Sequence, residues 1–165
     1  MPKNDKIAGQ VEEMIVGVIS DTHGLLRPEA LDVLKNSDVI VHAGDIGDPE
    51  ILKKLETTAP VTAIRGNIDR DAWAREIPPT SVLDAGGQLI YVVHNLADLD
   101  LKPEAAGLAA VIYGHSHIAK QEMKNGVLYF NPGSAGPRRF RLPVSVGRLT
   151  ITNGKIAAQI IDLDS

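Results

Sequence analysis

Residues 15–24 read Ile15-Val16-Gly17-Val18-Ile19-Ser20-Asp21-Thr22-His23-Gly24, and they set the architecture that we expect for the whole chain. The first part is a short, unbroken run of mostly β-branched apolar residues, which is typical of a strand buried on both faces of a sheet. The second part changes at once to polar residues and ends in glycine. A buried strand followed by Asp-x-His-Gly predicts a loop with functional side chains at the edge of a parallel sheet.

The same pattern returns twice further along the chain. Buried strands are predicted at Val39–His42 and Val61–Ile64, and each is followed by glycine and a polar residue. Helices are predicted between the strands, at Pro28–Lys35 and from Asp48-Pro49-Glu50 onward, where Asp caps the helix and Pro suits its first turn. The alternation of strand and helix predicts parallel βαβ units and an α/β protein.

The second half of the chain is expected to contain mostly strands and a single helix. These elements are predicted at Leu89–Val93 (strand), Asp98–Ala109 (helix), Val111–Tyr113, Val127–Phe130, Val144–Ile151 and Lys155–Leu163 (strands). Pro103 either begins or interrupts the helix. Asn153-Gly154 is a strong hairpin signal, so the last two strands are expected to be antiparallel.

The chain has 165 residues, and we expect residues 14–165 to form one domain with a core of its own. Residues 1–13 are polar and lack the apolar segment of a signal peptide, so we expect an N-terminal extension. No apolar run approaches the ~20 residues that span a bilayer, so neither a membrane partner nor a location outside the cytoplasm is expected. The absence of Cys excludes disulfides, iron–sulfur clusters and thiolate metal sites.

Charge and aromatic content argue against a nucleic-acid partner. The formal net charge is −4, and binding to a phosphate backbone requires basic surface. Aromatic residues make up 4% of the chain, which leaves little for stacking on bases and requires an aliphatic core.

Asp, Asn or His residues follow five of the predicted strands, and at four of these places a glycine lies beside them. These candidate ligands are Asp21, His23, Asp45, Asn67, His94, His115 and His117. They are too many for one tetrahedral metal ion, which takes about four ligands. They suit two ions about 3.5–4 Å apart that share a carboxylate. In Asp21-x-His23 and His115-x-His117, an extended backbone would direct both side chains to the same side.

The charge of such a centre favours a phosphate substrate. Two divalent ions, less two aspartates and one bridging hydroxide, leave one positive charge, because His and Asn are neutral ligands. The centre would attract an anionic phosphate ester and lower the pKa of bound water.

The ordered motifs Asp-x-His, Gly-Asp, Gly-Asn-x-Asp, a lone His and Gly-His-x-His resemble those of the calcineurin-like metallophosphoesterases. The sequence is most similar to their small YfcE-like phosphodiesterases, from Met14 to at least Pro137, with Asn131-Pro132-Gly133-Ser134 as a further shared block. The resemblance implies two packed mixed β-sheets flanked by helices, the α/β/β/α sandwich of that family. It also marks residues 1–13 as an addition.

The resemblance assigns a role to each candidate ligand. It implies that the first metal is held by Asp21, His23, Asp45 and His117. It implies that Asp45 bridges to a second metal, which Asn67, His94 and His115 complete, and that Asn67 also faces the substrate phosphate. Asp45 and Asn67 are therefore the expected catalytic residues. A site rich in oxygen and imidazole suggests Mn²⁺, with Ni²⁺, Zn²⁺, Fe or Mg²⁺ as alternatives.

Two positions depart from the family pattern. Many larger relatives have a His after the Gly-Asn pair, thought to help the leaving group depart, and here that residue is Ile68. We therefore expect a slower enzyme or one that prefers good leaving groups. Asn95 stands where Gly is more usual after the lone His, and it either adds a donor to the phosphate or alters the turn.

Several polar residues outside the ligand set have two interpretations. His42 is expected to pack beside the sheet, and Asp69 either orients Asn67 or Arg65 or forms a turn. Residues Asn131–Ser134 either hold a metal-binding His or form a tight turn. Three basic residues lie near that turn, Arg138, Arg139 and Arg141. They either bind a distal phosphate of the substrate or form a solvated surface, and we favour the solvated surface.

The sequence thus predicts a metal-dependent phosphodiesterase or phosphatase that hydrolyses small phosphate esters by attack of a metal-bridging hydroxide. The alternative is a non-catalytic protein-binding scaffold on the same fold, like the retromer scaffold subunit, whose metal site is degraded. None of the expected ligands is replaced here, which favours the enzyme. A second copy of the chain is also a candidate partner, because the C-terminal region is rich in exposed strands.

Overall fold

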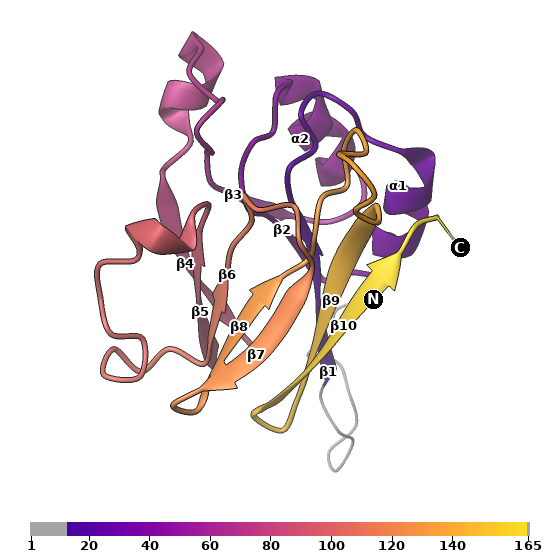
Figure 1. Ribbon diagram of the computed structural model, residues 1–165. Helices are drawn as coiled ribbons and strands as arrows, with labels where there is room; N and C mark the ends of the chain where they lie inside the picture. Colours follow the sequence, from indigo (N-terminus) through magenta and orange to yellow (C-terminus); the bar gives the residue numbers. More distant parts are fainter. Residues whose placement is uncertain (1–12, 165) are drawn as a thin grey trace.

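The computed structural model describes residues 13–164 as two five-stranded mixed sheets packed face to face (Figure 1). The first sheet has the order β10-β9-β1-β2-β3, with β1 at Glu13–Ile19, β2 at Val39–His42, β3 at Val61–Ala63, β9 at Ser145–Thr152 and β10 at Lys155–Asp162. The second has the order β4-β5-β6-β8-β7, with β4 at Thr80–Ala85, β5 at Gln88–Val93, β6 at Ala110–Ile112, β7 at Lys120–Lys124 and β8 at Val127–Asn131. The expected extension at 1–13 lies outside the described residues except for Glu13, which begins β1.

The parallel strands of the first sheet, joined by α-helices, confirm the predicted βαβ pattern, and the second sheet also has three parallel strands. In the first sheet β1, β2 and β3 are parallel, and in the second β5, β6 and β8 are parallel. The antiparallel strands β9, β10, β4 and β7 lie outside them. The carboxyl ends of parallel strands form a common edge in each sheet, so the loops that follow them can meet.

An aliphatic core fills the space between the two sheets. Val18 and Val41 of the first sheet and Ile90 and Ile112 of the second are fully buried in it. Phe130 on β8 is the largest fully buried side chain of the described residues. The predicted α/β class and the pair of packed mixed sheets are therefore confirmed.

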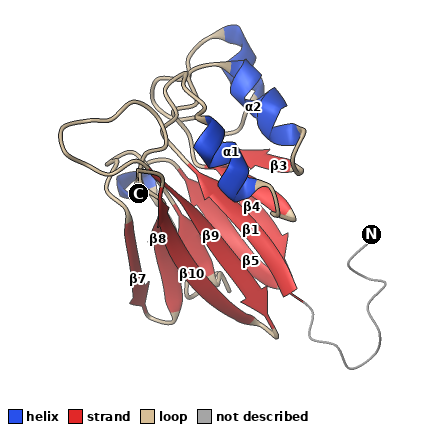
Figure 2. Cartoon of the chain, turned by 90° about the vertical axis from the view of Figure 1, so that its right-hand side faces the viewer, coloured by secondary structure: helices blue, strands red, loops and turns tan. Residues whose placement is uncertain are grey.

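Two α-helices cover the outer face of the first sheet, as Figure 2 shows. They are α1 at Pro28–Leu34 and α2 at Pro49–Glu56, and each begins with the predicted proline. Leu34 and Leu55 bury their side chains against this sheet. The carboxylate of Asp48 accepts a hydrogen bond from the Glu50 N–H at 2.9 Å, which confirms the predicted cap of α2. No helix within residues 13–164 is long and apolar enough to cross a membrane.

The helix predicted at Asp98–Ala109 is wrong. The segment holds only the end of a short 3-10 helix, η3 at Leu96–Asp98, followed by turns. Pro103 disfavours helical backbone in the residue before it, and Gly107 takes a positive φ of 74°, which ends any helical run. These turns cover part of the outer face of the second sheet, where Leu108 packs with buried residues of β5 and β6.

Two strands were missed by the sequence analysis. The edge strand β7 is polar and largely exposed, so its sequence carries no buried period. The strand β4 alternates only weakly between half-buried and exposed residues. Between β3 and β4 the chain also forms a 3-10 helix, η2 at Ala72–Glu76.

The buried ring of Phe130 gives a direct test of the packing between the sheets. We expect Phe130→Ala to lower the free energy of unfolding by about 3–5 kcal/mol, because it leaves a cavity in a closed core. Met123→Ala on the neighbouring β7, where Met123 is 65% exposed, is the control and should change it by less than about 0.5 kcal/mol. Chemical denaturation measures both, and equal effects would contradict the packing described here.

Candidate metal centre

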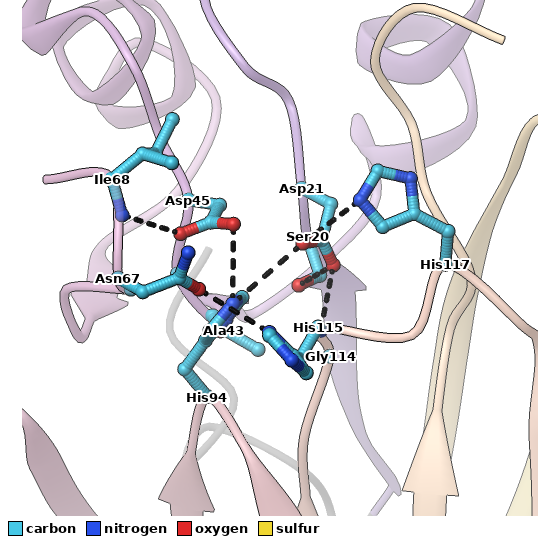
Figure 3. A network of polar contacts seen from close by, with 12 residues as sticks. Ser20, Asp21, Ala43, Asp45, Asn67, Ile68, His94, Gly114, His115 and His117 are labelled. Carbon is cyan, nitrogen blue, oxygen red and sulfur yellow. Dashed lines mark hydrogen bonds and ion pairs between the residues drawn. The ribbon is translucent and has the colours of Figure 1, made fainter. Parts of the chain in front are cut away.

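The seven predicted ligands come together at the carboxyl ends of the parallel strands. Figure 3 labels all of them except His23. The loops after β1, β2, β3, β5 and β6 supply Asp21 and His23, Asp45, Asn67, His94, and His115 and His117, respectively. Contacts between side chains link the whole set. His117 Nε2 lies 3.5 Å from Asp21 Oδ1, His94 Nε2 lies 3.3 Å from Asp45 Oδ2, and His115 Nδ1 lies 3.2 Å from Asn67 Oδ1.

The backbone at these residues differs from the extended conformation predicted for the two x-spaced pairs. Asp21, His23, Asp45, His115 and His117 all have positive φ, between 46° and 73°. Such values are uncommon outside glycine and cost conformational energy. The extended-backbone argument is therefore wrong, although it brought the correct residues together. Left-handed turns, and not strand pleating, direct these side chains inward.

Two glycines make room for the aspartates. A methyl group at Gly66 would collide with Asp45 Oδ1, and one at Gly114 would collide with the Ser20 hydroxyl and the carboxylate of Asp21. The loops after β3 and β6 can therefore approach the carboxylates only because these positions carry no side chain.

Each aspartate has one oxygen held by the protein and one aimed into the centre. Asp45 Oδ1 accepts the Ile68 N–H at 3.1 Å, while Oδ2 lies 3.4 Å from His23 Nε2 and 3.3 Å from His94 Nε2. Asp21 Oδ2 accepts the Ser20 hydroxyl at 2.7 Å and the His115 N–H at 3.1 Å. Asp21 Oδ1 is buried and has no hydrogen-bond partner among residues 13–164.

The imidazole of His94 is arranged in the same way. His94 Nδ1 lies 2.7 Å from the Ala43 carbonyl, which fixes the proton on this nitrogen and leaves Nε2 for the centre. Within the described chain, His23 Nε2 and His94 Nε2 are buried without a hydrogen-bond partner. Leaving buried polar atoms unpaired is costly, and a bound cation would satisfy them.

The donor atoms fall into two overlapping groups that fit a metal ion. One joins Asp21, His23 and His117, the other joins Asp21, Asp45 and His94, and within each group the ligand atoms lie within 4.8 Å of one another. Carboxylate oxygen and imidazole nitrogen suit divalent ions such as Mn²⁺ and Zn²⁺. The residues present therefore fit the metal site that the sequence predicts.

The surroundings of the site favour a charged carboxylate at Asp45 and a neutral imidazole at His117. Burial alone would raise the pKa of Asp45, but His94 and the Ile68 N–H outweigh it and hold that pKa below its usual range. Burial lowers the pKa of His117, which favours the neutral ring that a metal requires. Burial also opposes a charge on His94, yet the Asp45 carboxylate and the Ala43 carbonyl raise the pKa of this ring.

The block Asn131–Ser134 supports the ligand loops from behind. The Asn131 side-chain amide donates to the Gly114 carbonyl at 3.1 Å and to the Ser116 hydroxyl at 3.2 Å. The Ser134 hydroxyl donates to the Asp21 carbonyl at 3.1 Å. The block also forms a tight turn, in which Asn131 Oδ1 accepts the Gly133 N–H at 2.9 Å. It therefore has the predicted turn and, through it, contacts the loops that carry Asp21, His115 and His117, without a hydrogen bond to a His side chain among residues 13–164.

Asp69 joins two ligand loops, a role that the sequence analysis missed. Its buried carboxylate accepts three backbone N–H groups, from Ile46 and Gly47 at 3.0 Å and from Gly66 at 2.9 Å. The bond to Gly66 closes a turn, while the other two reach across to the loop that carries Asp45. The only sequence signal was the Asp of the Gly-Asn-x-Asp motif.

His42 lies outside the ligand set, as predicted, and joins the loops after β1 and β2. Its Nδ1 accepts the Gly44 N–H at 3.1 Å, so Nε2 carries the proton and donates to the Thr22 hydroxyl at 3.0 Å. That hydroxyl donates in turn to the Ile46 carbonyl at 2.8 Å. Burial lowers the pKa of His42 to about 4.

Asn95 and the arginines near the Asn131–Ser134 turn also had two interpretations. Asn95 Oδ1 accepts the Ala97 N–H at 3.0 Å and caps η3, so the residue shapes the turn. Arg138 forms an ion pair with Asp164 and donates to the Leu142 carbonyl at 3.1 Å. Arg139 and Arg141 are exposed, in line with the predicted solvated surface.

The chain is similar in sequence to known phosphoesterases. A family model described as a calcineurin-like phosphoesterase superfamily domain matches residues 14–154. A probable metallophosphoesterase of Methanothermobacter thermautotrophicus is 34% identical over 160 residues, which cover 90% of this chain and 92% of that protein. A phosphodiesterase of Methanocaldococcus jannaschii is 27% identical over 138 residues, which cover 73% of this chain and 83% of that protein.

A solved structure shares the fold at lower identity. Vps29 from Cryptosporidium parvum superposes with a TM-score of 0.72 and 18% sequence identity, over 89% of this chain and 96% of that chain. At this identity the likeness concerns the fold alone.

His42 should make the metal-free protein sensitive to acid. Its pKa is 6.5 when unfolded and about 4 when folded, so the unfolded chain takes up the proton first. Stability is full above pH 6.5 and should fall by about 3 kcal/mol as the pH is lowered toward 4. His42→Gln, which cannot titrate, should show a smaller loss in denaturation curves measured across this range. Equal losses in both proteins would contradict the assignment.

Asp69→Asn tests the junction between the two ligand loops. Asparagine offers one acceptor oxygen and turns an N–H toward backbone donors, so we expect unfolding to cost about 1–3 kcal/mol less. Mn²⁺ affinity, measured by calorimetry, should fall as well, because the Asp45 loop loses its anchor. Asp84→Asn, at an exposed turn where one oxygen accepts the Gly87 N–H, is the matched control. A less stable variant with unchanged Mn²⁺ affinity would show that Asp69 does not position the centre.

Proposed function

We propose that this chain, which belongs to the calcineurin-like phosphoesterase superfamily, is a metal-dependent phosphodiesterase or phosphatase acting on small phosphate esters. The main support for the proposal comes from two aspartates in which only one carboxylate oxygen accepts hydrogen bonds. Asp21 and Asp45 each give one oxygen to hydrogen bonds from the chain and turn the other toward unpaired imidazole nitrogens. Without a cation this arrangement is unfavourable, and bound cations would give partners to the unpaired Asp21 Oδ1, His23 Nε2 and His94 Nε2.

The distances support a dinuclear arrangement. Asp45 Oδ2 lies 3.4 Å from His23 Nε2 and 3.3 Å from His94 Nε2, so this carboxylate could be shared by two ions that these imidazoles would hold. Asp21 Oδ1 lies farther from the same two nitrogens, at 3.8 Å. We assign to the first metal Asp21, His23, Asp45 and His117, and to the second Asp45, Asn67, His94 and His115. The two aspartates are the only anionic members of this set, so two divalent ions would leave the centre positive toward phosphate.

The chain's own residues would then orient the ester. When bound, two divalent ions supply an activated water and neutralise charge on the phosphate. Asn67 is exposed, and its Oδ1 faces His115 Nδ1, which leaves the amide N–H₂ free to donate to a phosphate oxygen. A groove of about 270 Å³ lined by Asn67, His94 and His115 opens beside the centre.

Ile68 limits which esters can react quickly. Its backbone N–H serves Asp45, and its side chain, which is 43% exposed, cannot transfer a proton to a departing oxygen. The leaving group must be stable as an anion or take its proton from water. We therefore propose a preference for esters of acidic alcohols and phenols.

The rival function is a protein-binding scaffold. Vps29 shows that the fold occurs in a vacuolar protein sorting protein, but only the fold is shared at that identity. The complete set of seven donors, with its unpaired buried atoms, favours the enzyme. We propose Mn²⁺ as the working metal because the donors are oxygen and imidazole, although affinity order alone favours Zn²⁺ or Ni²⁺.

Hydrolysis of bis-p-nitrophenyl phosphate tests the proposed function. The protein is stripped with a chelator, and Mn²⁺, Ni²⁺, Zn²⁺ or Mg²⁺ is added back singly. We expect at least one metal to restore turnover, and Asp45→Asn to lower kcat by about a hundredfold or more, since it removes a charge at the reacting centre.

The matched control is Asp48→Asn, the same chemical change three positions along the chain. Asparagine caps a helix about as well as aspartate, so turnover should stay within about twofold. A folded protein without turnover under any metal would overturn the enzyme proposal and favour the scaffold.

A further inference from the structure

A second groove adjoins the one that opens beside the metal centre. The first groove, of about 270 Å³, is lined by the ligands Asn67, His94 and His115 and by Arg65. The second, of about 410 Å³, is lined by Arg65, Asp69, Arg70 and Arg75. Arg65 lines both, so the two grooves are neighbours. The first is also lined by the acidic residue Asp98. We name the second, which has three arginines, the arginine groove.

The arginine groove is positively charged in an acidic protein. The chain has a net charge of −4, yet three of the four residues lining this groove are arginines. The fourth, Asp69, is buried, and its two carboxylate oxygens accept hydrogen bonds from three backbone N–H groups. Its carboxylate forms no ion pair with the guanidinium groups of the groove.

Two of the three arginines are held in place by hydrogen bonds that do not neutralise them. Arg65 donates to the Ile77 carbonyl, and Arg70 Nε donates to the Asn67 carbonyl at 2.9 Å. Both partners are neutral backbone groups. Within residues 13–164, Arg65, Arg70 and Arg75 form no ion pair with a carboxylate.

The same loop carries the metal ligand and the arginines. Arg65 precedes Gly66-Asn67, Arg70 is bonded to the backbone of Asn67, and Arg75 lies in η2, which follows directly. This segment lies between β3 and β4 at the upper left of Figure 1. The position of the positive charge is therefore tied to that of the ligand that we expect to face the phosphate.

We propose that the arginine groove binds a second anionic group of the substrate, so that the preferred substrate is a phosphodiester carrying a further phosphate on one of its ester groups. Guanidinium groups match phosphate oxygens in geometry and charge and keep their charge at all physiological pH values. The inference rests on the proposed function for the scissile phosphate, while the second phosphate uses residues outside the metal centre.

Arg138, in the other arginine cluster of the chain, is less available for such a role. It is already paired with Asp164, and its second guanidinium nitrogen donates to the Leu142 carbonyl. The three arginines of the groove have no carboxylate partner of this kind within residues 13–164, and they share a cavity next to the one lined by the predicted ligands.

A matched pair of substrates tests the proposal. One is the p-nitrophenyl ester of thymidine 5′-phosphate, and the other is the same ester with an added 3′-phosphate. With Mn²⁺ present, we expect kcat/KM to be about tenfold higher for the second ester, equal to about 1.4 kcal/mol. Arg70→Gln with Arg75→Gln should bring this ratio close to one. Arg65 is left unchanged because its side chain holds the Ile77 carbonyl.

A second readout does not depend on turnover. Calorimetry with Mn²⁺-loaded protein should show thymidine 3′,5′-bisphosphate binding about tenfold more tightly than thymidine 5′-monophosphate, a difference lost in the double variant. The control is Lys53→Gln with Lys54→Gln on α2, which also removes two positive charges but lies outside both grooves. Both ratios should be unchanged in it.

The outcomes separate the two proposals. Equal kcat/KM for both esters, or a ratio that survives in the arginine double variant, would overturn the arginine groove while the enzyme stands. Tighter binding of the bisphosphate without hydrolysis of either ester would overturn the proposed function while the groove stands. Equal binding without hydrolysis would overturn both.

Discussion

The architecture depends on two buried aspartates that share one centre. Asp21 and Asp45 are almost fully buried, and each is held by hydrogen bonds at one oxygen only. Placing two carboxylates together out of water is expensive unless cations or donors compensate them. The surrounding loops supply these donors, and to do so they must come unusually close. The left-handed backbone at five ligands and the bare backbone at Gly66 and Gly114 follow from that requirement.

The features that could be predicted from the sequence are those that depend on regular secondary structure. Buried strands such as Ile15–Ser20 are recognisable from their apolar runs, and parallel strands bring their following loops to one edge, so the seven residues that meet at the candidate metal site could be named. Loop conformation could not be predicted, because positive φ at a residue such as Asp21 is stabilised by contacts from distant loops. The helix expected at Asp98–Ala109 failed for a local reason, since Pro103 and Gly107 allow only turns. The polar edge strand β7 carried no burial pattern to detect.

The metal centre depends on residues that contact no ligand side chain. His42 joins the loops after β1 and β2, and Asp69 joins the loops after β2 and β3. Asn131 supports the loop after β6. These side chains make hydrogen bonds to loop backbone that a helix or strand would otherwise satisfy within itself. The irregular loops are thereby held in place, together with the predicted ligands that they carry. Because these partners are far apart in sequence, only the Gly-Asn-x-Asp motif hinted at one of them.

A dinuclear centre alone has little power to choose among phosphate esters, since every ester presents the same phosphoryl group to it. Discrimination must come from residues around it. In the proposed enzyme, Ile68 would favour leaving groups that need no proton, because its side chain supplies none. Arg70, bonded to the backbone of Asn67, would favour substrates with a second negative charge. Both lie on the loop after β3 that also carries the ligand Asn67. One loop can therefore change substrate preference while the strands and the other ligand loops keep their geometry.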